Sequence, residues 1–308
     1  MKLAMIFPGQ GSQSPGMLKG YDGLPDVGPV REEVARVLGQ EFLTLLDEGP
    51  AEKLNLTVNT QPAMVTAGYA AYRAWLALGG PRPQMLAGHS LGEYTALVAA
   101  GALTFSDCLP LVRFRAQAMQ EAVPEGQGAM AAILNLDDEL VKQACASAGG
   151  EVQAVNFNAP GQVVIAGEKA AVARAIEACK AAGAKRALPL PVSAPFHSSL
   201  MRPAAERLKD YLQKVNIAPT QITVVNNVDV RVEREPAAIR DALARQAASP
   251  VRWVETIRKM VAMGATHIVE CGPGKVLAGM TKRIDPGVQS LTLNDRAAIE
   301  QALQGMKA

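Results

Sequence analysis

The stretch MLAGHSLGE, Met85–Glu93, decides the fold, because it joins a short apolar run to a helix-forming segment through a serine flanked by glycines. Met85–Ala87 predicts a buried strand, and the Ala- and Leu-rich segment Leu91–Ala100 predicts a helix directly after it. Between them, Gly88-His89-Ser90-Leu91-Gly92 has the G-x-S-x-G pattern of a nucleophile elbow. So tight a turn leaves no room for side chains on either flank, which explains the glycines. It lifts the Ser90 hydroxyl above the end of the sheet.

The helix that follows Ser90 makes the turn suited to acyl transfer. Free backbone N–H groups and the positive end of the helix dipole favour an oxyanion at this point, where acyl transfer develops one. The alternative is a chance pentapeptide in which Ser90 only caps a helix. Because both a strand and a helix are predicted in the correct places, the sequence favours a nucleophile.

Strands and helices alternate on both sides of the elbow. Leu3–Phe7 predicts a buried strand, and Pro62–Leu78 and Phe105–Glu121 predict helices. The strand His267–Glu270 is expected to close the alternation. A different order, strand-helix-strand-strand-helix-strand, occupies residues 129–190 and is typical of a ferredoxin-like unit.

We therefore expect an α/β fold: a hydrolase-like core with a parallel sheet flanked by helices, plus an inserted small ferredoxin-like α+β subdomain. The core is expected to comprise residues 1–123 and 197–308 and to carry the elbow. The insert is expected to comprise residues 124–196.

Composition argues against several classes of function. The chain has 308 residues, 49% of them hydrophobic, and 31 Lys and Arg against 29 Asp and Glu, a net charge of +2. Without a long run of like charge, no dominant electrostatic grip on nucleic acid or membrane is expected. The 4 cysteines form no CxxC pair and the histidines number only 3, so neither a zinc cage nor a disulfide framework is indicated. No apolar run suits a signal peptide or a membrane span, and we expect a cytoplasmic protein with reduced thiols.

A serine hydroxyl needs a base before it becomes a good nucleophile, and a histidine is the usual one. His89 lies inside the elbow and is expected to point away from Ser90, and His267 lies in an apolar strand and is expected to be a core histidine. His197 remains, in a proline-bounded loop where the insert returns to the core. The alternative is a surface loop histidine. No isolated Asp or Glu indicates a third member, so a dyad with His197 oriented by a neutral group is considered.

Two loops and one arginine are further candidate sites. The loop FPGQGSQ, Phe7–Gln13, is a candidate donor of a second oxyanion-hole N–H. It does not fit a dinucleotide loop, because Ser14 stands where the last glycine belongs. Gly272-Pro273-Gly274-Lys275 fails as a phosphate-binding loop and predicts a strand-to-helix turn. Arg115 is either a solvated helix arginine or a bidentate partner for a substrate carboxylate.

A series of short motifs follows in a fixed order along the chain. Together they resemble the malonyl-CoA:acyl carrier protein transacylases of fatty acid synthesis and, more broadly, the acyltransferase domains of polyketide synthases. The resemblance covers essentially the whole chain. The motifs are FPGQGSQ (7–13), NTQPA (59–63), GHSLGE (88–93), RxxxMQ (115–120), EGxGAMAA (125–132), NxPGQVVIAG (158–167), PVSAPFHS (191–198) and GPGKVL (272–277).

The resemblance implies roles for particular residues. Ser90 corresponds to the acylated serine and His197 to its catalytic partner. Gln246 corresponds to a glutamine whose backbone carbonyl orients that histidine, which accounts for the missing acid. Gln10 and Leu91 correspond to the residues whose backbone N–H groups form the oxyanion hole.

The resemblance also implies the substrates. Arg115 corresponds to the arginine that pairs with the free carboxylate of malonate, although Ala116 follows it where the family commonly has glycine. Phe196 before His197 resembles the malonyl-selective form of the family. The donor is then malonyl-CoA and the acceptor is the phosphopantetheine thiol of acyl carrier protein, in a ping-pong reaction for fatty acid biosynthesis. We expect no metal, no further cofactor and a monomer.

Two alternatives remain at this stage. A serine hydrolase such as a thioesterase has the same elbow but admits water, and a catalytically silent domain only binds carrier protein. The resemblance implies an acidic carrier protein, so Lys185 and Arg186 in the expected insert are candidates to steer it.

Overall fold

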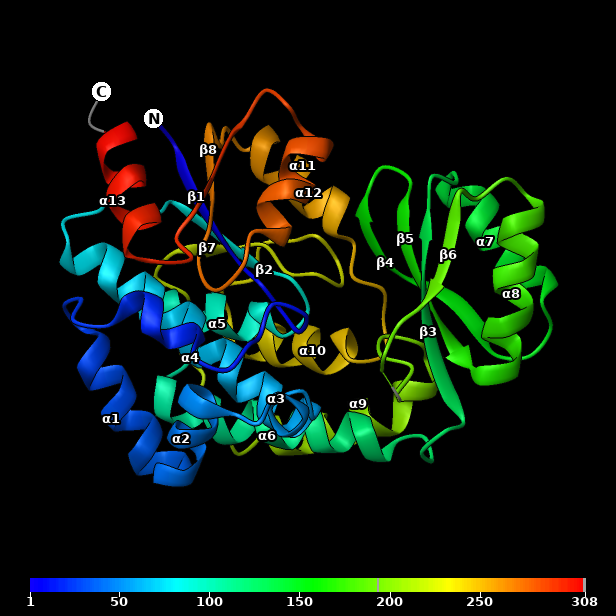
Figure 1. Cartoon of the computed structure of the whole chain (residues 1–308), viewed down its shortest axis with the longest axis horizontal. Helices are drawn as coiled ribbons and strands as arrows, with labels where there is room; N and C mark the ends of the chain where they lie inside the picture. Colours follow the sequence, from blue (N-terminus) through cyan, green and yellow to red (C-terminus); the bar gives the residue numbers. More distant parts are fainter. Residues whose placement is uncertain (193, 307–308) are drawn as a thin grey trace.

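The computed structural model describes residues 1–192 and 194–306 and contains two sheets, one parallel and one antiparallel. Figure 1 shows the parallel sheet with most of the helices at one end of the molecule and the antiparallel sheet at the other. The first and last described elements lie near each other on the same side (Figure 1). No helix among the described residues has both the length and the apolar character needed to cross a membrane.

The parallel sheet is built around the apolar run LAMIF. All residues of this strand are buried, as expected for the centre of a parallel sheet with helices on both faces. It pairs in parallel with the strand that precedes the elbow and with the strand at residues 267–270. The order across the sheet is β7 (Thr223–Val224), β2 (Met85–Gly88), β1 (Leu3–Phe7), β8 (His267–Glu270) and β9 (Gln289–Thr292).

Helices cover this sheet and carry several of the residues that surround Ser90. The elbow helix α5 follows β2 directly, and α6 begins with the Thr104 side chain accepting a hydrogen bond from the Asp107 N–H. The helices of this part are α1 (Val27–Leu38), α2 (Gln40–Glu48), α3 (Ala51–Leu54), α4 (Thr57–Ala77), α5 (Gly92–Ala99), α6 (Phe105–Glu121), α9 (Arg202–Leu212), α10 (Pro236–Gln246), α11 (Trp253–Ala262), α12 (Val276–Ile284) and α13 (Arg296–Gly305), with short 3₁₀ turns η1 (Met17–Tyr21) and η2 (Ser199–Met201).

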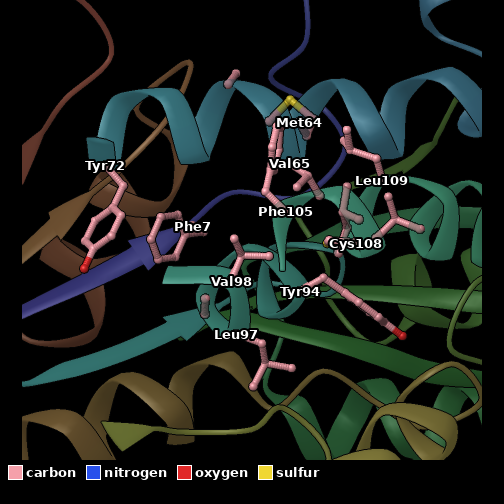
Figure 2. Close-up of a cluster of buried hydrophobic side chains, with 14 of the residues drawn as sticks. Phe7, Met64, Val65, Tyr72, Tyr94, Leu97, Val98, Phe105, Cys108 and Leu109 are labelled. Atoms are coloured by element: carbon pink, nitrogen blue, oxygen red, sulfur yellow. The ribbon is translucent and has the colours of Figure 1, made fainter. Parts of the chain in front are cut away.

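Part of the apolar core lies between α4, α5 and the end of β1. The helix α4 is buried on nearly all sides and includes Gly68, where an added Cβ would lie 3.1 Å from the Thr95 side chain. A small residue at this position lets α4 approach α5 closely. Figure 2 shows the apolar side chains that fill the space, among them Phe7 from β1, Met64 and Val65 from α4, Tyr94, Leu97 and Val98 from α5, and Phe105 and Leu109 from α6.

The antiparallel sheet has the order β4-β5-β3-β6, with every neighbouring pair antiparallel. Together with the element order this is the ferredoxin-like unit that the sequence predicts. Its helices lie on the face turned away from the parallel sheet (Figure 1). Its elements are β3 (Gly128–Leu134), α7 (Asp138–Ser147), β4 (Val152–Ala159), β5 (Gln162–Glu168), α8 (Lys169–Ala181) and β6 (Arg186–Pro189).

The α/β core and the antiparallel subdomain are thus confirmed, while the boundaries of the insert at residues 124 and 196 stay a prediction. Strand β4 contacts the rest of the molecule directly: the Phe157 N–H donates to the Val251 carbonyl over 3.0 Å, and the Val251 N–H donates to the Val155 carbonyl over 2.7 Å. Asn156, the residue between Val155 and Phe157, lines the same cavity as Ser90.

Two expectations about elements were wrong. Helix α4 begins at Thr57, not at Pro62, because the first turns continue through the proline and bring Gln61 onto the helix. The strand at residues 267–270 does not close the alternation, since α12, β9 and α13 follow it.

Candidate active site

The elbow is a strained turn, and only glycine fits at the positions on either side of it. Ser90 has φ 51°, in the left-handed region that side chains rarely adopt. A Cβ on Gly88 would lie 1.8 Å from the Gly92 carbonyl carbon, and one on Gly92 would lie 2.0 Å from the Phe7 carbonyl oxygen. The turn therefore packs against the end of β1, as expected for a nucleophile held above a sheet.

Ser90 and His197 come together, and Gln246 lies behind the histidine. The Ser90 Oγ is 2.6 Å from His197 Nε2, and His197 Nδ1 is 2.9 Å from the backbone carbonyl of Gln246. A carbonyl only accepts, so Nδ1 carries the proton and Nε2 has the lone pair that faces the serine. This tautomer is the one a general base needs.

The surroundings keep His197 neutral. The side chain is 3% exposed. Burial and the nearby Arg115 charge lower the pKa of His197 to about 3, and the hydrogen bond with Gln246 opposes the shift. At neutral pH the ring is therefore free to accept the serine proton.

Arg115 is buried in the same place, which excludes the solvated-arginine interpretation. The side chain is 2% exposed, and its Nη1 donates to Gln61 Oε1 over 2.8 Å. Its Nη2 donates to Gln246 Oε1 over 2.9 Å and lies 3.2 Å from Ser90 Oγ. Burial lowers the pKa of Arg115 from its ordinary value, yet a guanidinium stays charged at any physiological pH. A fixed positive charge thus lies beside the serine, and no carboxylate of the described residues forms an ion pair with it.

The loop that carries Gln10 approaches the elbow that carries Leu91. Gly9, next to Gln10, passes close to the elbow: a Cβ there would lie 2.7 Å from the His89 carbonyl oxygen and 3.8 Å from the Leu91 nitrogen. Among the described residues, neither the Gln10 N–H nor the Leu91 N–H donates to a protein acceptor. The Gln10 side chain is turned to α4, where its Oε1 accepts from Thr57 Oγ1 over 3.0 Å.

A cavity of about 140 Å³ lies over these groups. A second one, of about 600 Å³, adjoins it and shares Gln10, Leu190, Val192 and Phe196 with it. The inner cavity has room for a short acyl group but not for a nucleotide. It is lined by Gln10, Gln61, His89, Ser90, Leu91, Arg115, Met119, Met130, Asn156, Leu190, Val192, Phe196 and His197.

Sequence reasoning missed three polar residues around the site. Gln61 binds Arg115, as described above. Asn227 accepts from the Ser90 N–H over 2.7 Å and donates to the Gly88 carbonyl over 2.7 Å, which ties down both sides of the elbow. Glu93 lies under the elbow, 2% exposed. Two signals were present: an acidic residue in the otherwise buried helix 92–99, and an Asn-Asn pair directly after the strand region at 223–225.

The rings of the other histidines have hydrogen-bond partners other than Ser90. His89 Nε2 is 2.7 Å from Asn158 Oδ1, its ring packs edge-on against Trp253, and burial lowers its pKa. His267 is half-buried and bonds with Thr266 Oγ1, so it is not the core histidine that its apolar strand predicted. Residues 272–275 form the turn between β8 and α12, as expected. Of the motif at 191–198, Ser193 lies outside the described residues.

Comparisons with known proteins agree with this geometry. A family model described as "Acyl transferase domain" matches residues 4–289. The malonyl CoA-acyl carrier protein transacylase of Escherichia coli K12 is 53% identical over 306 residues, which cover 98% of this chain and 99% of that protein. A crystal structure of the acyl-carrier-protein S-malonyltransferase from Burkholderia pseudomallei 1710b has TM-score 0.97 and 59% identity, over 99% and 100% of the two chains. A malonyl-transacylase in complex with a type II polyketide synthase acyl-carrier protein has TM-score 0.97 and 50% identity, over 99% and 100% of the chains.

Proposed function

Because the chain belongs to the acyl transferase domain family, as a malonyl-CoA:acyl carrier protein S-malonyltransferase of fatty acid synthesis, we propose that it transfers malonyl through an acyl-enzyme on Ser90. The observation that carries this proposal is the 2.6 Å contact between Ser90 Oγ and the neutral, buried His197. The route is ping-pong: malonyl-CoA binds and CoA leaves before acyl carrier protein enters.

In the first half-reaction His197 Nε2 takes the Ser90 proton while Oγ attacks the malonyl thioester carbonyl. The resulting oxyanion accepts from the Gln10 and Leu91 N–H groups. When the tetrahedral intermediate collapses, the C–S bond breaks and the proton on His197 passes to the CoA sulfur. In the second half-reaction the phosphopantetheine thiol gives its proton to His197 and its sulfur attacks the malonyl ester. The bond from the carbonyl carbon to Oγ then breaks, and His197 returns the proton to Ser90 Oγ.

Arg115 supplies the selectivity for a diacid in this proposal. A malonyl group on Ser90 carries a free carboxylate a few bonds from Oγ, and Arg115 Nη2 lies 3.2 Å from that oxygen. Because no carboxylate among residues 1–192 and 194–306 pairs with this buried guanidinium, it favours an acyl group that brings its own negative charge. The inner cavity takes the malonyl group, and the adjoining cavity has room for the pantetheine arm.

Acyl carrier protein is the partner, and we assign Lys185 and Arg186 to its approach because both are exposed beside and on the edge strand β6. A location in the cytoplasm is part of the same proposal, and its support is that the cysteines, Cys108, Cys145, Cys179 and Cys271, are free and buried. The monomer stays a prediction.

Intact mass spectrometry with peptide mapping tests the acyl-enzyme. After brief mixing with malonyl-CoA, we expect one malonyl adduct on the Ser90 peptide, and its loss when phosphopantetheinylated carrier protein is added. Ser90→Ala removes the adduct, whereas Ser147→Ala, a serine variant on α7 outside the cavity, keeps it. An adduct that persists in Ser90→Ala contradicts the proposal. Equally fast release of free malonate without carrier protein would instead identify a hydrolase.

A further inference from the structure

Glu93 is a buried carboxylate that the transfer reaction does not use. It lies in the first turn of α5, three residues after Ser90 in the chain, and is 2% exposed. Its Oε2 accepts from the Asn227 N–H over 3.0 Å and from Gln246 Nε2 over 2.9 Å. A buried carboxylate is unfavourable unless its hydrogen bonds are satisfied, so these donors account for its presence but not for its purpose.

The Gln246 side chain is held at both ends. Its Nε2 donates to Glu93 Oε2 and to the Ser90 carbonyl, each over 2.9 Å, and its Oε1 accepts from Arg115 Nη2. The two ends of an amide have nearly the same shape, so the partners decide which way it points. The Ser90 carbonyl only accepts, and Glu93 Oε2 already accepts from the Asn227 N–H, which directs Nε2 toward both oxygens. The oxygen is then left to face Arg115.

The reverse orientation is unfavourable for Arg115. Turned over, Gln246 would present an NH₂ group to a guanidinium, which has donors only. Arg115 Nη2 would then lose the acceptor at 2.9 Å and keep only its longer contact of 3.2 Å with Ser90 Oγ, while Nη1 would keep its bond to Gln61. The chain of contacts from Glu93 through Gln246 therefore sets where the guanidinium lies relative to Ser90.

We propose that Glu93 is a positioning residue for malonyl selectivity: through the Gln246 amide it aims the Arg115 guanidinium at the substrate carboxylate. This inference rests on the proposed role of Arg115. Two charged side chains lie near Glu93: Arg115 on α6 favours the ionised carboxylate, and Asp229, in the loop after β7, opposes it. Burial raises the pKa of Glu93 to about 7, while its two hydrogen bonds and Arg115 favour the charged form.

The test is the single-turnover rate of Ser90 acylation from malonyl-CoA and from acetyl-CoA. In Glu93→Ala we expect the malonyl-to-acetyl ratio to fall by about tenfold, the size of one typical coupling between neighbouring residues. Glu93→Gln retains an oxygen that accepts the same two bonds and should restore most of the ratio. A purely structural role for Glu93 would slow both donors alike and leave the ratio unchanged, which would overturn the proposal.

A double-mutant cycle tests the path through Gln246. Gln246→Met removes the amide and should lower the ratio as much as Glu93→Ala does, and the double variant should lower it no further. Additive losses contradict the path. If Glu93→Ala fails to fold, an unchanged ratio in Gln246→Met still overturns the proposal.

Two further variants separate the possible failures. Glu270→Ala removes another buried carboxylate, one that accepts from the Ala278 N–H over 2.8 Å outside the cavity, and should keep the wild-type ratio. Arg115→Ala should lower the ratio at least as far as Glu93→Ala. An unchanged ratio in Arg115→Ala refutes the role of Arg115 itself, whereas a fall there without one in Glu93→Ala refutes only the role of Glu93.

Discussion

At the scale of the residue, the surrounding contacts hold His197 in a backbone conformation and a buried position that a histidine rarely adopts. Its φ of 65° lies in the left-handed region, and its ring is buried next to a guanidinium. Strain of this kind persists only where the surroundings over-determine it, and it gathers at active sites. The Gln246 carbonyl and the Ser90 hydroxyl, one on each ring nitrogen, are the contacts that hold it.

The buried, neutral His197 makes the protein sensitive to acid. Its pKa is about 3 in the fold and 6.5 ordinarily, so the unfolded chain binds more protons between these values and stability falls as the pH drops from 6.5. Between pH 7 and pH 5 we expect His197 to cost ~2 kcal/mol of unfolding free energy. In His197→Asn this loss should vanish, as measured by urea unfolding at both pH values.

Two buried carboxyl groups change the stability in the opposite direction with pH. Their contribution is the same in wild type and in His197→Asn, so it cancels when the two proteins are compared. Burial raises the pKa of both Glu93 and Glu270 to about 7. These groups bind protons more readily in the fold, so they add stability as the pH falls from 7 to 4.5, in wild type and variant alike. The same pH dependence in wild type and His197→Asn would show that His197 titrates normally.

At the scale of the element, the glycines at both ends of the elbow differ from glycines in ordinary helices. Gly92→Ala would place a Cβ 2.0 Å from the Phe7 carbonyl oxygen, and we expect a loss of roughly 3 kcal/mol or more. Gly279 lies inside α12 with nothing within 4 Å of its added Cβ. Gly279→Ala should therefore gain about 1 kcal/mol from helix propensity alone.

Urea unfolding of the two alanine variants checks this contrast. If Gly92→Ala is as stable as wild type, the elbow does not pack against β1 as closely as described. A loss of stability in Gly279→Ala would show that α12 has a neighbour at this position.

Elements with a strong local pattern were predictable from the sequence, and short or irregular ones were not. The strands at 3–7 and 267–270 and the helix at 105–121 were predicted with the bounds observed, because apolar spacing and turn residues agree there. The missed strand β9 has only four residues, none of them buried, at the edge of the sheet. The missed helices α2, α3 and α13 are at most 10 residues long.

The candidate site divides in the same way. Ser90 is found from a local motif, and His197 by elimination among few histidines. Gln246 acts on His197 through its main chain, so its residue type gives no direct signal, and only the family resemblance pointed to it. Glu93 and Asn227 matter through contacts between residues more than 130 positions apart, which a single sequence does not display.

At the scale of the whole molecule, the nearly neutral chain leaves recognition of its partner to local charge. Lys185 and Arg186 are exposed at the edge of the antiparallel sheet. Reversing both, Lys185→Glu with Arg186→Glu, should slow malonyl transfer to an acidic carrier protein by roughly tenfold at low salt and flatten its salt dependence. Acylation by malonyl-CoA should keep its rate. Stopped-flow transfer assays across a salt series measure both.

A control with the same change in net charge is available on another surface. Lys209 and Lys214 are exposed on and after α9. Lys209→Glu with Lys214→Glu should leave the transfer rate close to wild type. An equal decrease in both double variants would mean that overall charge, and not the surface at 185–186, governs the encounter.

The inner cavity takes its lining from residues 124–196 and from the chain on both sides of them. Ser90, Arg115 and His197 come from outside residues 124–196, whereas Met130, Asn156, Leu190, Val192 and Phe196 come from within them. The reactive groups therefore come from outside residues 124–196, whereas residues 124–196 supply apolar and amide side chains that shape the cavity. A recombination event that replaced residues 124–196 would change the shape of the space for the acyl group and leave the nucleophile, the base and Arg115 unaltered. An engineer could graft that stretch from a relative for the same purpose.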